Sequence, residues 1–211
     1  MAENKVTSSI IANDDANLRS DVRRLGDLLG QSLVRQEGPE LLELVEKVRK
    51  AVRESGEDEL LKTITDDQAV DLVRAFSTYF HLANVAEQVH RSRVLAEARR
   101  DGKSWLTRAV DKIIEAQKNP ATGHEFTQAD IEKWVSELQV RPVFTAHPTE
   151  AARRSILGKL AEISSLLDLP KSITQDERLA ETVDLLWQTD ELRLDRPEPL
   201  DEAMNALYYL D

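Results

Sequence analysis

One short run of β-branched and aromatic residues constrains the fold of this chain more than any other feature. Residues 139–146 read Gln-Val-Arg-Pro-Val-Phe-Thr-Ala, a run too short and too rich in β-formers for a helix, and predict one strand at about 140–146. A lone strand leaves its backbone N–H and C=O groups without partners. The chain offers no second strand pattern, so we expect its 211 residues to be part of something larger.

Amphipathic helices are predicted over most of the remaining chain, because apolar residues recur at steps of three and four. They are expected from Leu18 to the Gly38-Pro39 break, from Leu41 to Gly56, from Thr65 to about Arg100, from Ser104 through Ile114, from Thr127 through Leu138, from Pro148 to the Leu169-Pro170 break, from Leu179 to about Leu194, and from Leu200 to Asp211. The fold class is therefore mainly α. Residues 1–16 are polar and aperiodic and are predicted to be a disordered tail.

Two details of these helices can be compared with a structure. On the long helix after Thr65 the predicted apolar face consists of Val70, Val73, Phe76, Phe80, Ala83 and Val89. Hydrogen-bonding side chains predict helix starts at Thr65, at Thr127 with Asp130, and at residues 174–177, where Thr-Gln-Asp-Glu has the spacing of a capping box.

Composition excludes several classes of protein. The 28 basic and 39 acidic residues give a formal charge of −11, which argues against binding to nucleic acid or to an anionic membrane. The chain has no cysteine, so it can form neither a disulfide nor a thiolate metal site. Neither a signal peptide nor an apolar run of about 18 residues is present. We therefore expect a soluble protein of the cytoplasm.

Local motifs for metals and nucleotides are missing. The sequence has no His-Glu-x-x-His, no Gly-x-Gly-x-x-Gly and no Walker loop. His81 and His90 are nine residues apart on one predicted helix, about half a turn out of phase, and cannot share a metal ion. His124 lies in a Gly/Pro loop, where solvation is the simplest interpretation.

His147 is the candidate catalytic residue because of its position. It follows the predicted strand, at the end where parallel α/β folds place their sites, and precedes a predicted helix whose N–H groups attract anions. Arg153 and Arg154 add two positive charges to an acidic chain. The alternative is structural: His147 caps or packs against the helix, and the arginines pair with Glu150 or with residues 190–191, as we expect for at least one of them.

Several stretches together resemble phosphoenolpyruvate carboxylases. The first signature of that family is similar to Phe144-Thr145-Ala146-His147-Pro148-Thr149-Glu150 followed by Arg153-Arg154. Further similar stretches are Leu18 to Gly26, Arg74-Ala75-Phe76-Ser77, Leu82 to Gln88, Trp187-Gln188-Thr189-Asp190-Glu191-Leu192-Arg193, Arg196-Pro197 and Asp201-Glu202-Ala203, in the expected order from about residue 17 onward. Some members have histidine at the position of Gln188, which we interpret as structural.

The resemblance implies a fold and a reaction. The family is helix-rich and built on a (β/α)₈ barrel of the TIM type, so residues 17–211 would be its N-terminal helical region with one barrel strand. The family adds bicarbonate to phosphoenolpyruvate, forming oxaloacetate and phosphate and so supplying the tricarboxylic acid cycle with fixed carbon dioxide. It uses magnesium or manganese, whose ligands would lie beyond residue 211, and the intact enzyme would be a homotetramer.

The resemblance also assigns roles to residues. Carboxyphosphate and the pyruvate enolate form first, carboxyphosphate then yields carbon dioxide, and the histidine matching His147 takes the proton. A neutral imidazole suits this task near pH 7. Arg153 and Arg154 become candidate substrate-binding residues. We expect the 211 residues alone to be inactive. The alternative hypothesis is a helical interaction or regulatory module that has the signature without the activity, using the Leu/Val-striped helices of residues 18–53 to bind a partner.

Overall fold

The described part of the chain contains seven α-helices with defined bounds, a few helical positions after residue 199, and no β-strand. The computed structural model describes residues 3–54, 61–102, 104–116, 123, 125, 127–139, 141, 153–191, 198, 200–201, 203–204 and 207. The helices divide between two compact units, one formed by residues 1–91 with 148–211 and the other by residues 92–147. The prediction of a mainly α protein is confirmed.

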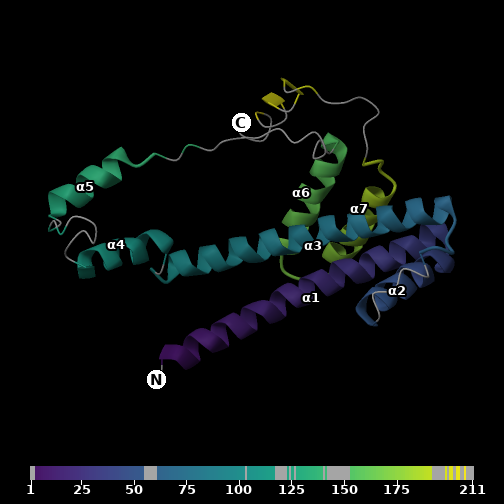
Figure 1. Ribbon diagram of the computed structural model, residues 1–211, viewed down its shortest axis with the longest axis horizontal. Coiled ribbons are helices and arrows are strands. Elements are labelled where there is room, and N and C mark those ends of the chain that lie inside the picture. Colours follow the sequence, from purple (N-terminus) through teal and green to yellow (C-terminus); the bar gives the residue numbers. More distant parts are fainter. Residues whose placement is uncertain are drawn as a thin grey trace. The chain divides into compact units, whose positions relative to one another are not determined.

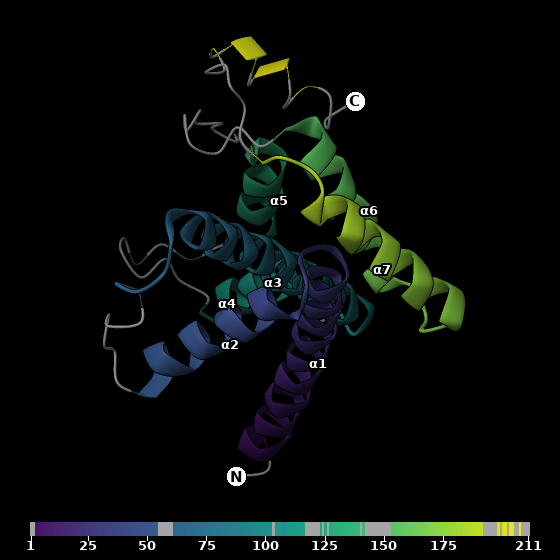
Figure 2. The same cartoon turned by 90° about the vertical axis from the view of Figure 1, so that its right-hand side faces the viewer.

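The first unit is a group of packed helices. Its elements are α1 (Glu3–Glu37), α2 (Pro39–Glu54), the larger part of α3 (Asp66–Arg100), α6 (Arg154–Asp168) and α7 (Ile173–Trp187). Helix α1 packs against α2 and against α7, and α6 and α7 form a second pair (Figure 1, Figure 2). Gly38 alone connects α1 to α2, and a short segment, residues 169–172, connects α6 to α7.

The predicted break between the first two helices and the predicted start of the third are confirmed. Gly38 adopts a φ of 96°, a conformation that other residues rarely take, and α2 begins at the following proline. At the start of α3 the Thr65 hydroxyl accepts a hydrogen bond from the Gln68 backbone N–H, and the Gln68 side chain accepts one from the N–H of Thr65. These two reciprocal bonds satisfy backbone donors that the first helical turn leaves without partners.

One hydrophobic core lies between all five helices of the first unit. Its buried members are Leu25, Leu29 and Leu33 of α1, Leu41 of α2, Ala75, Leu82, Val85, Ala86 and Val89 of α3, Ile156, Ile163, Leu166 and Leu167 of α6, and Leu179, Val183, Leu186 and Trp187 of α7. Apolar burial is the main force that holds the helices together.

The predicted apolar face of α3 is wrong at three positions. Val70, Val73 and Phe80 are 65%, 70% and 61% exposed. The helix instead buries Leu72, Ala75, Thr78, Leu82, Val85, Ala86 and Val89. Apolar residues occur on more than one side of this helix, so periodicity alone cannot decide which side meets the core. The choice is made by the partner helices.

Helix α6 begins later than predicted. Arg153 has an extended backbone, with φ −61° and ψ 145°, and α6 begins at Arg154 instead of at Pro148. Ile156 is the first buried residue of α6, and packing of this kind supplies most of the stability of a helix. The free N–H groups of α6 therefore belong to a turn seven residues after His147.

Both predicted ends of α7 are also corrected. Its N-cap is Ser172, whose hydroxyl accepts a hydrogen bond of 3.2 Å from the backbone N–H of Gln175. The buried side chain of Gln175 donates to the carbonyl oxygens of Leu166 and Leu169 at the end of α6, which fixes the turn between the helices. A local capping pattern at residues 174–177 could not reveal this tertiary use of Gln175. The helix ends at Trp187, before the predicted Leu194.

The N-terminus differs from the prediction as well. Helix α1 begins at Glu3, so the backbone is helical through most of residues 1–16, where the sequence predicts a disordered tail. Residues 3–16 contain neither glycine nor proline. Once a helix has formed, each further residue adds a hydrogen bond at little cost, so a packed helix can extend in this direction.

The second unit contains the end of α3, α4 (Trp105–Ala116) and α5 (Gln128–Glu137). Gly102, with a φ of 65°, follows α3, and the Ser104 hydroxyl accepts a hydrogen bond from the N–H of Thr107 in the first turn of α4. Thr127 and Asp130 form the predicted capping box of α5. The predicted starts of both helices are therefore confirmed.

The predicted strand and His147 lie outside the described residues. Of residues 140–146 only Arg141 is described, and it belongs to no regular element. The last predicted helix is described at five positions, which are all helical: Leu200, Asp201, Ala203, Met204 and Leu207. None of the helices in the described ranges is long and apolar enough to cross a membrane.

Candidate functional site: a polar cluster between α3 and α7

A cluster of polar side chains joins α3 to the end of α7. Arg74, Ser77 and His81 come from one side of α3, and Trp187 and Glu191 come from the last residue of α7 and from the segment after it. The three α3 residues are spaced by three and four positions, so their side chains project from the same face of the helix. We call these five residues the α3–α7 cluster.

Glu191 is the centre of the cluster. The Ser77 hydroxyl donates a hydrogen bond of 2.8 Å to Oε2 of Glu191, and Nε2 of His81 lies 2.6 Å from Oε1. The side chains of His81 and Glu191 are 31% and 38% exposed. Each carboxylate oxygen therefore has its own partner. Because Ser77 and His81 are one helical turn apart on α3, their two bonds together fix the orientation of the carboxylate.

The surroundings of Glu191 favour its ionised form. Partial burial raises the pKa of this carboxyl, but the hydrogen bonds from His81 and Ser77 and the charge of His81 outweigh burial, so the pKa lies below its ordinary value. Glu191 is consequently an anion at neutral pH and acts in the cluster as an acceptor of hydrogen bonds.

Trp187 anchors the same end of α7 in the core. Its side chain is 1% exposed, and its indole N–H donates a 2.9 Å hydrogen bond to Oε1 of Glu37 on α1. The guanidinium of Arg74 stacks over the indole with Cζ 4.2 Å from the ring centroid, and it also donates to the backbone carbonyl oxygen of Trp187. A cation over an indole face adds electrostatic attraction to the packing.

A cavity of about 800 Å³ adjoins the cluster. Ser77 and His81 line it together with Glu191, and so does Arg153, the half-buried N-cap residue of α6. Apolar side chains from α3, α6 and α7 also line it, namely Ala69, Val70, Val73, Ile156 and Leu186, and so do the polar residues Arg74, Thr78, Thr189 and Asp190. A mostly apolar cavity with a few converging polar groups has the general character of a binding site.

The hydrogen bonding within the cluster limits the chemistry available to it. In a nucleophilic triad the histidine lies between the hydroxyl and the carboxylate. Here the carboxylate of Glu191 lies between Ser77 and His81, so the histidine does not contact the hydroxyl through this network. The arrangement holds a carboxylate in place and does not activate the serine.

The structure does not assemble the predicted site residues into one described group. His147 lies outside the described residues. Arg153 lines the cavity, whereas Arg154 is the first residue of α6 and is exposed. Both arginines have interaction partners, and their predicted roles as substrate-binding residues stay predictions. In the described part of the chain, no three His, Asp or Glu side chains gather in a way that could hold a metal ion.

Sequence reasoning did not identify the contact between α3 and Glu191. The stretches 74–77 and 187–191 both resemble one family, but nothing local shows that residues 113 and 114 positions apart form hydrogen bonds. The signal that could have found the α3 side is a polar stripe. Arg74, Ser77 and His81 recur at helical spacing on a helix that is otherwise rich in apolar residues.

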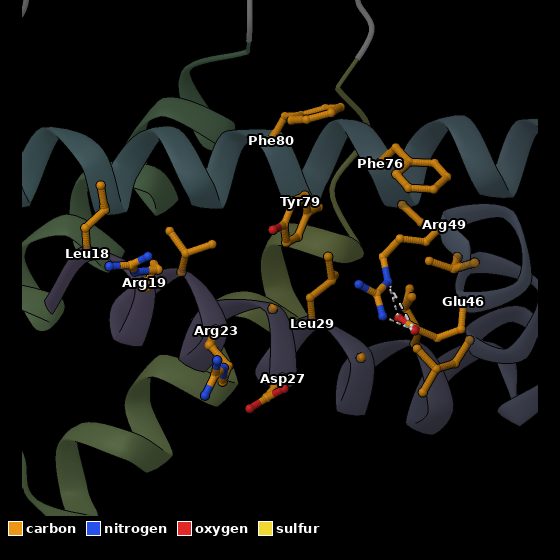
Figure 3. A pocket seen from close by; sticks show the side chains of 17 residues that line it. Leu18, Arg19, Arg23, Asp27, Leu29, Glu46, Arg49, Phe76, Tyr79 and Phe80 are labelled. Carbon is orange, nitrogen blue, oxygen red and sulfur yellow. Dashed lines mark hydrogen bonds and ion pairs between the residues drawn. The ribbon is translucent and has the colours of Figure 1, made fainter. Parts of the chain in front are cut away.

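A second hollow, of about 880 Å³, lies between α1, α2 and α3 (Figure 3). Gly26 and Gly30 of α1 leave room for neighbouring side chains there, since a Cβ atom on Gly26 would lie 3.4 Å from Cε2 of Tyr79. Arg49 and Glu46 of α2 pair across 2.6 Å at one end. Two of the three helices that form this groove, α1 and α2, are the ones that the alternative hypothesis assigns to partner binding.

The fold and the cluster define a helical scaffold in which distant polar residues fix one end of a helical hairpin. The sequence model of the family described as phosphoenolpyruvate carboxylase matches residues 18–211. The chain belongs to the phosphoenolpyruvate carboxylase family. The resemblance seen in the separate stretches is thereby confirmed over almost the whole chain.

Curated relatives agree with this assignment. Phosphoenolpyruvate carboxylases of Azorhizobium caulinodans, Xanthomonas oryzae pv. oryzae and Ralstonia nicotianae are 37%, 36% and 38% identical over 221, 220 and 225 residues. The matches cover 93%, 97% and 96% of this chain but 23%, 24% and 22% of the relatives. The chain thus spans about a quarter of the length of the curated relatives it matches.

Proposed function

We propose that this chain is the N-terminal part of a phosphoenolpyruvate carboxylase, which forms oxaloacetate and phosphate from phosphoenolpyruvate and bicarbonate. The observation that carries the proposal is the family match over residues 18–211. The structure adds support because two stretches of family resemblance, 74–77 and 187–191, contact each other in the α3–α7 cluster. In the cell the reaction would supply oxaloacetate to the tricarboxylic acid cycle.

The remaining features of the enzyme belong to the same proposal. Residues 140–146 would form one strand of a (β/α)₈ barrel, whose other strands lie in the rest of the protein. Magnesium or manganese would be held there as well. The intact enzyme would be a cytoplasmic homotetramer. The family match includes every stretch of resemblance, which favours the enzyme over an inactive helical module.

We propose that His147 is a catalytic base. The O–H bond of carboxyphosphate breaks and its proton passes to the imidazole, the released electron pair forms the second C=O bond, and phosphate departs with the electrons of its bond to carbon. The enolate carbon then attacks the carbon dioxide. An imidazole can take this proton because its ordinary pKa of about 6.5 leaves it mostly neutral near pH 7. Arg153 and Arg154 would offer positive charge to the anionic substrate.

The test uses the full-length protein with His147→Asn. Asparagine removes the base, and loss of general-base catalysis should lower oxaloacetate formation by about 10²- to 10⁴-fold. The assay couples oxaloacetate to its reduction at saturating bicarbonate and magnesium. His124→Asn is the matched control, since that histidine is predicted to be solvated. Wild-type turnover of the His147→Asn protein would exclude the assigned role, and oxaloacetate formation by the 211-residue chain alone would show that the site is complete within it.

A further inference from the structure

Helix α3 carries apolar residues on two opposite sides. Val73 and Leu82 are nine residues apart, which is two and a half turns of an α-helix, so their side chains point in opposite directions. The side of Leu82 is buried in the core. Figure 3 shows that Phe80 lies on the side of α3 turned away from α1, whereas Tyr79 points toward α1. We call the side opposite the core the outer face of α3, and its apolar members are Val70, Val73, Phe76, Phe80 and Ala83.

The outer face is largely open to solvent. Val70, Val73 and Phe80 are 65%, 70% and 61% exposed, and Phe76 and Ala83 are half-buried. Val70 and Val73 line the cavity beside the α3–α7 cluster. Phe76 and Phe80 line the groove between α1, α2 and α3. The outer face is therefore a ridge of apolar side chains with a hollow beside it at either end, and all of these residues belong to the first unit.

No charge interrupts the outer face. Three residues of α3 between positions 70 and 83 can carry a charge near neutral pH, namely Asp71, Arg74 and His81. Asp71 is nine residues before Phe80 and so lies on the opposite side of the helix. Arg74 and His81 are turned toward the α3–α7 cluster. A surface without charges is typical of permanent contacts, because the centres of such interfaces are depleted of charged residues.

The size of the outer face indicates what kind of partner covers it. At 1.5 Å per residue, residues 70–83 span about 20 Å, and a helix is about 10 Å wide, so the face has an area of about 200 Å². A stable contact between separate proteins buries about 800 Å² on each partner. A segment of the same polypeptide needs less area, because it loses no translational or rotational freedom of a second molecule.

The family comparison shows that such a segment is available. The matches cover 23%, 24% and 22% of the three curated relatives, so about three quarters of each relative lies outside the matched part. We propose that the outer face of α3 is a docking surface for an uncharged, apolar segment of the polypeptide that follows residue 211. This rests on the proposed function, which makes the chain the N-terminal part of a longer carboxylase. Covered in this way, α3 is buried on both sides, as a helix with apolar residues all round requires.

The first experiment measures whether the outer face is covered in the full-length protein. Residues 1–211 contain no cysteine, so the cysteine of Val73→Cys can be followed in its own peptide by mass spectrometry after reaction with a maleimide. Its rate in the native protein, divided by its rate in denaturant, should be at least about 100-fold lower than the same ratio for the control, because the thiol reacts only when the covering segment opens. The control is Lys50→Cys on the exposed, charged side of α2.

The second experiment identifies the segment. In the full-length protein, Phe80→p-benzoylphenylalanine places a photoreactive ketone on the outer face, and irradiation should join it to a peptide that follows residue 211 without raising the mass of the polypeptide. A doubled mass would show that a second copy covers the face, and a cross-link to residues 92–147 would show that the second unit does. Either result would overturn the proposed occupant.

Oxaloacetate formation by the wild type separates this inference from the proposed function. An active wild type in which the cysteine of Val73→Cys reacts as fast as that of Lys50→Cys would overturn the docking surface alone. Val70→Cys repeats the measurement if Val73→Cys does not fold, with the same expected protection. A protected outer face in a protein that forms no oxaloacetate would overturn the carboxylase function and support the docking surface.

Discussion

Helix α7 is bound to its neighbours in two different ways. Toward α1 it presents two aspartates: exposed Asp176 pairs with Arg24, and half-buried Asp184 pairs with Arg35 across 2.7 Å. Toward α3 the segment after it presents Glu191, which is held by the uncharged hydroxyl of Ser77 and by His81. The first interface uses permanently charged arginines, and the second uses a hydroxyl and a titratable ring.

The two carboxylates show what this difference means. Burial raises the pKa of Asp184. Hydrogen bonds from Arg35, Ser32 and Gln36 and the charge of Arg35 lower this pKa by more than burial raises it, so the pKa lies below its ordinary value. The pKa of Glu191 is lowered in the same sense by His81 and Ser77. Pairs between exposed charges add little to stability and are screened by salt. The bonds to Glu191 depend more on geometry, and we expect salt to affect them less.

Trp187 takes part in both interfaces, so its removal should have the largest effect. Trp187→Ala deletes a side chain that is 1% exposed and also breaks its contacts with Glu37 and Arg74. We expect the free energy of unfolding to fall by about 3–5 kcal/mol, the usual cost of such a cavity. Chemical denaturation of the purified protein measures it. Leu185→Ala on the same helix, where the side chain is 52% exposed, should cost less than about 1 kcal/mol.

Single substitutions on the two sides of α7 test the comparison directly. Ser77→Ala removes one donor from Glu191 and should lower the free energy of unfolding by about 1 kcal/mol, because a partly buried carboxylate loses a hydrogen bond. Arg35→Gln removes the exposed partner of Asp184 and should cost less than about 0.5 kcal/mol. Denaturation at low and at high salt separates them. If high salt also abolished the stability loss caused by Ser77→Ala, the two interfaces would be equally electrostatic and the contrast between them would be wrong.

The smallest effect is the dependence of stability on pH. Because the folded pKa values of Asp184 and Glu191 both lie below the ordinary values of 3.8 and 4.5, the folded state binds fewer protons than the unfolded state in this range. Their stabilising contribution is complete above these ordinary values and is lost as the pH falls through the folded pKa values. Solvent screening keeps each contribution below about 1 kcal/mol.

Denaturation between pH 3 and pH 7 measures this loss. The Asp184→Asn variant should lose less stability on acidification than the wild type at low salt, and the difference should shrink in concentrated salt. Ser77→Ala should reduce the part of the acid-induced loss of stability that comes from Glu191, at low and at high salt alike. Equal acid sensitivity of the wild type and both variants would show that these carboxylates do not contribute.

The sequence by itself determined where most helices lie and to which family the chain belongs. Gly38 with Pro39, Thr65 and the Thr127–Asp130 pair mark helix ends through local bonds and backbone conformation, which need no partner from elsewhere in the chain. The signature around His147 is likewise a property of neighbouring residues. Such features can be predicted because the interactions behind them span only a few positions.

Only the tertiary structure decided which surfaces meet. Val70, Val73 and Phe80 have the spacing of a buried stripe and yet are exposed, because α1, α6 and α7 pack against the side of α3 that carries Leu82 and Val85. The same choice of side brings Ser77 and His81 to Glu191. Periodicity shows that a helix has an apolar side, but when a helix has more than one, the energy of packing against other helices selects among them.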